Sequence, residues 1–159
     1  MNGRTYSKVW TLTKHRYLLK YHEIYYQRIQ ALKEQVKELK ARLTEADYSQ
    51  REIVKFAARV RQADQVVIPQ NPDRPDYRLK GALRKYRRYK QGLQRYRLFF
   101  CFSNTPPIIL YLYLNNEEHL RKEGDKDDPY MEFKRLVDRG QVSHNPSAES
   151  IQQWIHDRL

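Results

Sequence analysis

Cationic and phenolic side chains alternate between positions 77 and 97, and they are the residues of this sequence best suited to chemistry. The segment carries nine Lys or Arg and four Tyr, with no Asp or Glu. Lys and Arg neutralise phosphates and release the counterions bound to them, and Tyr rings stack on unpaired bases. A polyanion with unpaired bases is therefore the ligand that this segment favours.

The chain as a whole also carries an excess of positive charge. The 159 residues carry a net charge of +12. Residues 1–115 hold 24 Lys or Arg against 9 Asp or Glu, whereas residues 116–159 hold 7 against 10. Such a concentration of cations among aromatic residues indicates binding to nucleic acid or to the ribosome. The alternative is a basic protein whose charge serves only its solubility.

The sequence also limits the compartment in which the protein works. Cys101 is the only cysteine and lies in an apolar run, so we expect a buried, unreactive thiol and no disulfide within the chain. The first residues lack the apolar core of a secretory signal. The longest apolar run, Ile108–Leu114, is too short to span a membrane. We expect a cytoplasmic protein with no membrane partner.

Periodicity predicts a single α+β domain over residues 1–159. Val9–Thr13 has the alternation of a short strand. Apolar residues then recur every three or four positions, which predicts a helix from about His15 to about Leu43. Ser49–Glu52 matches a capping box and predicts the start of a second helix, which is closed near Pro69. Residues 15–66 should therefore form an antiparallel helical hairpin.

Residues 77–115 predict an antiparallel sheet of about four strands. After the sheet, residues 128–159 should hold C-terminal helices. One of these starts at Asp128–Pro129, because Pro is tolerated in the first turn, and continues to about Asp138. The expected strands are 77–83, 87–90, 95–103 and 108–115, and the expected last helix is about 147–155.

Alternation along the last expected strand predicts which side chains reach an open face. One set should pack on helices, and the other should share a partly open face with Arg97, where a ligand can bind. In the alternative, the tyrosines of the second set are ordinary sheet surface. The first set is Ile108, Leu110, Leu112 and Leu114, and the second is Ile109, Tyr111, Tyr113 and Asn115.

The order of these elements and several short motifs resemble the YhaV toxins, a branch of the RelE-like fold. The motifs are Tyr96-Arg97-Leu98-Phe99-Phe100, Ile108-Ile109-Leu110, Asn115, Glu117, Leu120-Arg121, Gly124, Asp128, Tyr130, Phe133 and Arg139-Gly140. The resemblance implies a type II toxin that cleaves RNA, inhibits growth and uses no metal or other cofactor. It also implies a PrlF-like antitoxin with an AbrB-type fold as partner, with operator DNA bound only through the toxin–antitoxin complex.

RelE-like enzymes surround the scissile phosphate with Arg, Lys and Tyr, and the resemblance assigns such roles to this sequence. Arg97 would grip the phosphate of the transition state. Arg88 and Lys90 would form a basic pair on the preceding strand, with Lys90 as a general acid or base. Tyr130 would stack on a base or transfer a proton.

The segment after the last strong strand departs from the RelE pattern. RelE-type toxins usually carry an Arg there, but here Asn115–His119 intervenes. Arg121, beyond this insertion, is a candidate second phosphate clamp, and the departure makes His119 and Glu117 rival acid–base candidates. The expected contacts to the RNA backbone, ribose or bases are Lys80, Arg84, Lys85, Arg87, Tyr111, Tyr113, Asn115 and Asn116.

Two classes of function remain open at this point. The first is a metal-independent endoribonuclease that acts on free RNA or on mRNA at the ribosome. RNA supplies its own nucleophile, the ribose 2′-OH, so the protein must orient it and stabilise charge on the phosphorus centre. The second is a basic RNA- or DNA-binding module without catalysis.

Overall fold

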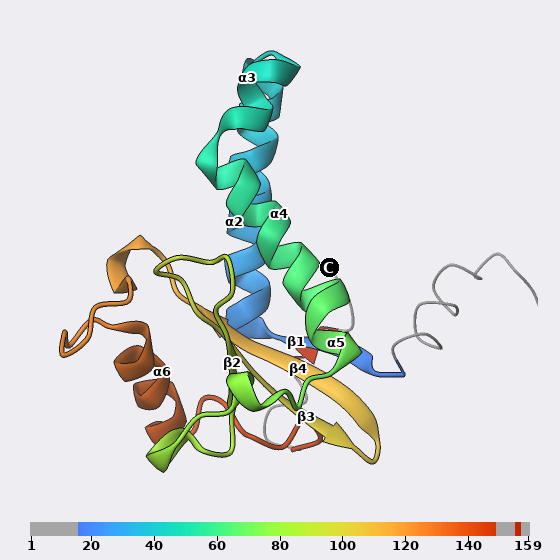
Figure 1. Cartoon of the computed structure of the whole chain (residues 1–159), viewed down its shortest axis with the longest axis vertical. Coiled ribbons are helices and arrows are strands. Elements are labelled where there is room, and N and C mark those ends of the chain that lie inside the picture. The colour runs from blue at the N-terminus through green and yellow to red at the C-terminus, as the bar shows by residue number, and fades with distance from the viewer. Residues whose placement is uncertain (1–15, 149–154, 157–159) are drawn as a thin grey trace, which may run out of the picture.

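The computed structural model describes residues 16–148 and 155–156, which form a five-stranded sheet covered on both faces. The strand order is β2-β3-β4-β1-β5 (Figure 1). β1 runs parallel to β4 and the other pairings are antiparallel. The sheet is thus mixed, rather than antiparallel throughout. The strands are β1 (Leu18–His22), β2 (Arg87–Tyr89), β3 (Leu98–Asn104), β4 (Pro107–Leu114) and β5 (Ile155–His156).

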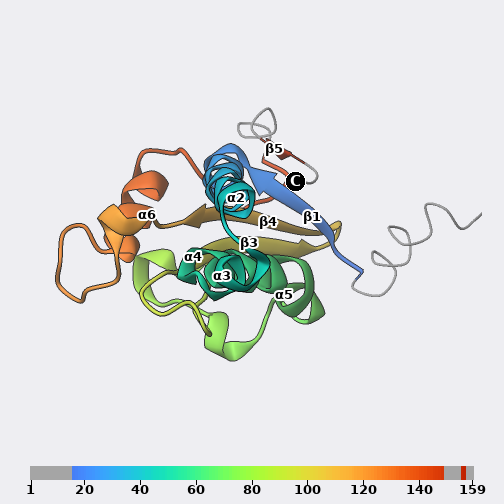
Figure 2. The same ribbon diagram turned by 90° about the horizontal axis from the view of Figure 1, so that it is seen from above.

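Helices cover the two faces unequally. The base of a helical hairpin packs on one face, and α6 packs on the other. Figure 2, seen from above, shows α2 and α4 over the strands and α6 to the left of them. The far end of the hairpin, with α3, projects away from the sheet in Figure 1. The helices are α2 (Glu23–Arg42), α3 (Glu45–Gln50), α4 (Glu52–Gln62), a π-helical turn at Ala63–Val67, α5 (Ile68–Gln70) and α6 (Pro129–Asp138). None of the helices in the described part of the chain is long and apolar enough to cross a membrane.

The hairpin is confirmed, but its first helix starts later than expected. Leu18–His22 is a strand, and the His22 imidazole Nδ1 accepts a hydrogen bond from the Ile24 N–H (3.1 Å), which caps α2. Tyr21 in this strand and Tyr17 just before it are buried in the core. The expected strand Val9–Thr13 lies outside the described residues.

The expected capping box in the hairpin turn is wrong. Ser49 lies inside α3, where its hydroxyl donates to the Ala46 carbonyl (3.1 Å). Thr44 caps α3 instead, because its Oγ1 accepts from the Asp47 N–H (3.2 Å). α4 begins at Glu52 with no side-chain cap.

The segment 77–83 is not a strand. It contains one isolated bridge, between Arg78 and Arg87, flanked by 3-10 turns at Pro75–Tyr77 and Gly81–Leu83. Gly81 has a φ of +64°, a value that L side chains adopt only with strain. These turns bury Tyr77 and Leu83 in the two core clusters. The strands expected at 87–90, 95–103 and 108–115, and the helix from Asp128–Pro129, are confirmed with shorter or shifted ends.

A β-bulge overturns the expected division of β4 into two faces. Phe99 pairs with Tyr113 and Phe100 pairs with Tyr111, so Leu112 is an extra residue in β4. As a result, Tyr111 packs under the hairpin while Tyr113 packs on the α6 side. Tyr111 is 0% and Tyr113 8% exposed. The prediction of a partly open face is therefore wrong, because both faces of the sheet are covered.

Most of the helix expected at about 147–155 falls outside the described residues. Residues 149–154 lie outside the described residues, and Ile155, at its expected end, belongs to β5. Cys101 is buried as expected, and burial raises the pKa of its thiol.

A buried carboxyl group joins the hairpin to the sheet. The Tyr25 hydroxyl donates to Asp64 Oδ2 (2.6 Å), and Arg61 Nη1 donates to the same oxygen (3.0 Å). The Tyr111 hydroxyl donates to the Asp64 backbone carbonyl. Asp64 is 0% exposed, and burial raises its pKa from 3.8 to about 7.

This pKa predicts a pH dependence of stability. The folded-state pKa exceeds the unfolded value. Between pH 3.8 and about 7, Asp64 is therefore protonated more often in the folded protein than in the unfolded chain. The contribution of Asp64 to the free energy of unfolding should be largest at low pH and decline as pH rises through about 7. Urea unfolding of wild type and Asp64→Asn across this range should show that the variant lacks the decline. Asp138→Asn, at an exposed site, should keep it; equal slopes in all three proteins would contradict the assignment.

Candidate active site

Asn115 organises the edge of the sheet where β3 begins and β4 ends. Its Oδ1 accepts from the Arg97 N–H (2.7 Å), and its Nδ2 donates to the carbonyls of Arg95 (3.2 Å) and His119 (2.7 Å). The side chain is 0% exposed. Asn115 therefore holds together the two segments that carry the candidate residues, and its amide is not available to a ribose or a base.

Arg97 is fixed by backbone carbonyls and by a phenol. Its Nη1 donates to the carbonyls of Gln94 (2.6 Å) and Tyr96 (2.8 Å), and its Nε donates to the Tyr130 hydroxyl (3.3 Å). Its Nη2 donates to no residue in the described part of the chain. A half-buried guanidinium held in this way keeps donors free for a phosphate at little further cost in side-chain entropy.

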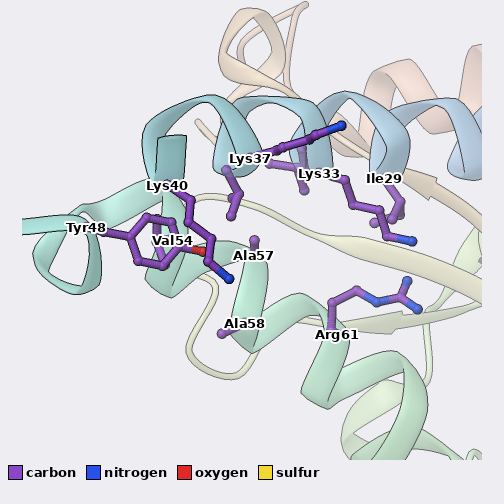
Figure 3. A pocket seen from close by; sticks show the side chains of 11 residues that line it. Ile29, Lys33, Lys37, Lys40, Tyr48, Val54, Ala57, Ala58 and Arg61 are labelled. Atoms are coloured by element: carbon purple, nitrogen blue, oxygen red, sulfur yellow. The ribbon is translucent and has the colours of Figure 1, made fainter. Parts of the chain in front are cut away.

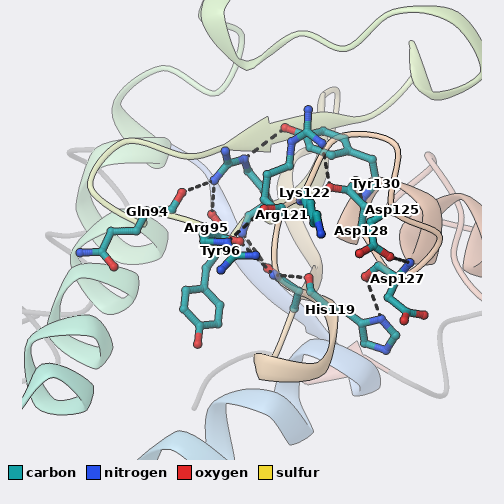
Figure 4. A network of polar contacts seen from close by, with 12 residues as sticks. Gln94, Arg95, Tyr96, His119, Arg121, Lys122, Asp125, Asp127, Asp128 and Tyr130 are labelled. Carbon is teal, nitrogen blue, oxygen red and sulfur yellow. Dashed lines mark hydrogen bonds and ion pairs between the residues drawn. The ribbon is translucent and has the colours of Figure 1, made fainter.

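Tyr130 lies at the N-terminus of α6, close to Arg121 (Figure 4). Its ring meets Phe99 edge-on with centroids 5.4 Å apart, and the Arg121 guanidinium lies 4.9 Å from the ring centroid. The hydroxyl oxygen accepts from Arg97, so its own hydrogen can be donated outward. The structure thus places both Arg97 and Arg121 in contact with Tyr130.

Asp128 builds this end of α6 and also engages Arg121. Its Oδ2 accepts from the Tyr130 N–H (2.9 Å), and its Oδ1 accepts from Arg121 Nη1 (2.7 Å) and the Lys122 N–H (2.9 Å). The hydrogen bond to Asp128 raises the pKa of Arg121. Arg121 already has a carboxylate partner, so it is a weaker candidate for a phosphate clamp than Arg97.

Removing the Asp128 carboxylate should destabilise the protein. Asp128→Ala loses a helix cap and a charge-assisted hydrogen bond, and we expect the free energy of unfolding to fall by about 2 kcal/mol. Urea denaturation measures this loss. Asp127→Ala is the matched control, because Asp127 is exposed and adjacent. Equal stabilities of the two variants would contradict the role given to Asp128.

His119 is directed toward a neighbouring loop. Its Nδ1 lies 3.1 Å from the Asp127 carbonyl oxygen, and Figure 4 shows the ring turned toward Asp127. Its backbone carbonyl accepts from Asn115. Glu117 is exposed beside it, and Asn116 Oδ1 accepts from the Glu118 N–H (3.0 Å). We find no contact of His119, Glu117 or Asn116 with Arg97 or Tyr130 among the described residues.

Strand β2 adds cations to the same face of the sheet. Arg88 pairs with Phe99, whose ring packs on Tyr130, so Arg88 lies on the α6 side. Its Nε and Nη1 are buried and have no hydrogen-bond partner within the described residues. Lys90 is exposed just past the end of β2. One more residue of the same register would set Lys90 opposite Arg97.

Arg87 faces the other way. It pairs with Phe100, its guanidinium lies 5.3 Å from the Phe102 ring centroid, and its Nη2 donates to Asp73 Oδ1 (3.2 Å). This places Arg87 on the hairpin side of the sheet, and the expectation that it joins the RNA-contacting surface is corrected for that reason. The expectation that Tyr111 and Tyr113 contact RNA is also wrong, because buried rings cannot stack on a base. Lys80, Arg84 and Lys85 are exposed and remain candidates for backbone contacts.

Sequence reasoning missed two residues of this site. Asp128 was recognised as a helix start, but its pairing with Arg121 was not expected. Arg28 of α2 had no signal at all, because it lies 87 residues from its partner: its Nε and Nη2 donate to the Asn115 carbonyl (3.2 and 3.1 Å). No group of three His, Cys, Asp or Glu side chains suited to a metal ion occurs in residues 16–148 and 155–156.

Comparisons with known proteins identify the family of this chain. The chain belongs to the YhaV toxin family, described as a toxin with endonuclease activity, of a toxin–antitoxin system; the family model matches residues 19–150. Toxin YhaV of Escherichia coli O6:H1 is 32% identical over 138 residues, which cover 83% of this chain and 87% of that protein. Ribonuclease toxin YhaV of Escherichia coli K12 is 32% identical over 124 residues, 75% of this chain and 80% of that protein. No solved structure matches the chain.

Proposed function

We propose that this chain is a single-domain toxin that cleaves RNA by attack of the ribose 2′-OH, with no metal ion in the chemical step. The observation that carries the proposal is the Arg97–Tyr130 pair on the sheet face that also holds Arg88. A relative named as a ribonuclease toxin supports RNA as the substrate. Fixed guanidinium groups supply positive charge to a phosphate, which is the electrostatic part of such a reaction.

The reaction divides among the residues as follows. The 2′ oxygen forms a bond to phosphorus, and the bond from phosphorus to the 5′ oxygen breaks. Arg97, through its free Nη2, and Arg88 stabilise the negative charge on the non-bridging oxygens. Lys90, as a neutral amine, takes the proton of the 2′-OH and becomes an ammonium group, and Tyr130 gives its hydroxyl proton to the leaving 5′ oxygen. The hydrogen bond from Arg97 Nε to the Tyr130 oxygen stabilises the phenolate left behind.

The partners follow from the family. Membership in a toxin–antitoxin system supports an antitoxin partner. We propose that it is PrlF-like with an AbrB-type fold, and that operator DNA is bound only through the complex. The substrate is mRNA, either free or on the ribosome, and the protein acts in the cytoplasm.

Product analysis tests the proposal directly. Purified full-length chain should cleave single-stranded RNA in EDTA and leave 2′,3′-cyclic phosphate and 5′-hydroxyl ends. The same assay with ribosomes and mRNA identifies which form of RNA is the substrate. Cleavage that requires a divalent metal, or 3′-hydroxyl ends, would overturn the mechanism. Tight binding of RNA that remains intact under both conditions would instead support a non-catalytic binding module.

A further inference from the structure

The two long helices of the hairpin leave a groove between them that nothing in the described chain fills. The groove encloses about 440 Å³ and lies between α2 and α4 (Figure 3). Its apolar lining includes Leu32 and Val36 from α2 and Val54 and Ala57 from α4. Of these, only Leu32 is buried. The hairpin therefore carries an apolar stripe that its own packing covers incompletely.

The rim of the groove is strongly cationic. Lys33, Lys37, Lys40 and Arg61 line it, and none of the carboxylates in the described residues does. Arg61 is paired with Asp64, but no ion pair joins the three lysines to any described residue. Figure 3 shows these long side chains along both sides of the groove. Burial and then the nearby Arg61 charge lower the pKa of Lys33, so the cations disfavour one another. An anionic occupant would relieve this repulsion.

We propose that the groove between α2 and α4 is the docking site for an acidic amphipathic helix of the antitoxin. This inference rests on the proposed function in taking the antitoxin as partner, and it adds the surface and the chemistry of the contact. The apolar side of such a helix would cover the exposed stripe, and its carboxylates would reach the rim lysines. The small side chains of Ala57 and Ala58 leave room for a helix to approach α4.

The lining distinguishes this occupant from two others. RNA would be attracted to the rim, but its charged backbone gains nothing from an apolar floor. A second copy of this chain, with a net charge of +12, would bring more cations to a cationic rim. A helix that is both acidic and apolar matches both features.

Matched charge reversals test the proposal. Lys37→Glu with Lys40→Glu changes the rim, and Arg42→Glu with Lys55→Glu makes the same change of charge on the same hairpin outside the groove. The probe is the PrlF-like antitoxin proposed above as the partner, purified and titrated by calorimetry into full-length toxin. The groove pair should raise the dissociation constant at least tenfold, and the control pair less than threefold. A third variant, Ala57→Trp, should also weaken binding, because it fills the groove.

Two further measurements keep the outcomes separate. Circular dichroism should show that all variants stay folded, and RNA cleavage by the free toxin should be unchanged in each. Equal antitoxin affinity for the groove pair, the control pair and Ala57→Trp would overturn the docking site. A loss of RNA binding in the groove pair, with antitoxin affinity intact, would overturn it in favour of an RNA surface. If wild type fails to cleave RNA but the groove variants still lose the antitoxin, the docking site stands and the catalytic proposal fails.

Discussion

Arg97→Ala should reduce the rate of RNA cleavage by about 10³, because it removes a fixed guanidinium from the transition-state phosphate. The loss should be in kcat more than in KM, since the charge it stabilises develops during the reaction. Arg97→Lys should recover only a small part of the rate, because an ammonium group cannot both reach the phosphate and replace the Nε bond to Tyr130. Single-turnover cleavage of a labelled RNA measures both variants.

Arg95→Ala is the control for this experiment. It removes the same charge two residues away, and within the described part of the chain its exposed side chain donates only to the Arg121 carbonyl (3.1 Å). We expect a rate within about tenfold of wild type, as for a charge that contributes to RNA attraction without touching the reacting atoms. If Arg95→Ala and Arg97→Ala lose the same activity, general electrostatic attraction explains the effect and Arg97 has no special role.

The sequence predicted the elements of the fold better than the faces of its sheet. Local signals identify α6, because Asp128–Pro129 both caps and starts a helix. They also identify the strands that became β3 and β4. The bulge at Leu112 has no such signal, because alternation assumes that every residue is paired. One extra residue sends Tyr113 to the opposite side from Tyr111 and removes the expected open face.

The site was predicted only in part, for a related reason. Arg97 and Tyr130 were recognised from motifs of the family, and the structure brings them into contact. The expected role of Asn115 as a ligand contact is wrong because its amide closes three hydrogen bonds within the protein. Such a side chain satisfies backbone groups that would otherwise be buried without partners. Whether an amide faces a ligand or the backbone depends on distant segments, which composition and spacing do not specify.

Arg88 should show opposite effects on activity and stability when it is replaced by an apolar side chain. Its Nε and Nη1 are buried and have no partner in residues 16–148 and 155–156, and each unsatisfied buried donor costs free energy. We expect bound RNA to satisfy this guanidinium. Arg88→Met keeps the aliphatic packing of the side chain and removes the donors. We therefore expect cleavage to fall by about 10², while the free energy of unfolding rises by about 1 kcal/mol.

The neighbouring residue supplies the matched control. Arg87→Met removes the same group from the opposite face of the sheet, where the guanidinium is bonded to Asp73 and stacked on Phe102, although its Nε is also unpartnered. Cleavage by Arg87→Met should stay near wild type, and its free energy of unfolding should fall by about 0.5–1 kcal/mol. Urea denaturation and cleavage assays of both variants measure these two effects. An Arg88→Met protein that is less stable and still active would make Arg88 a structural residue, and a loss of activity in Arg87→Met would return that residue to the RNA-binding surface.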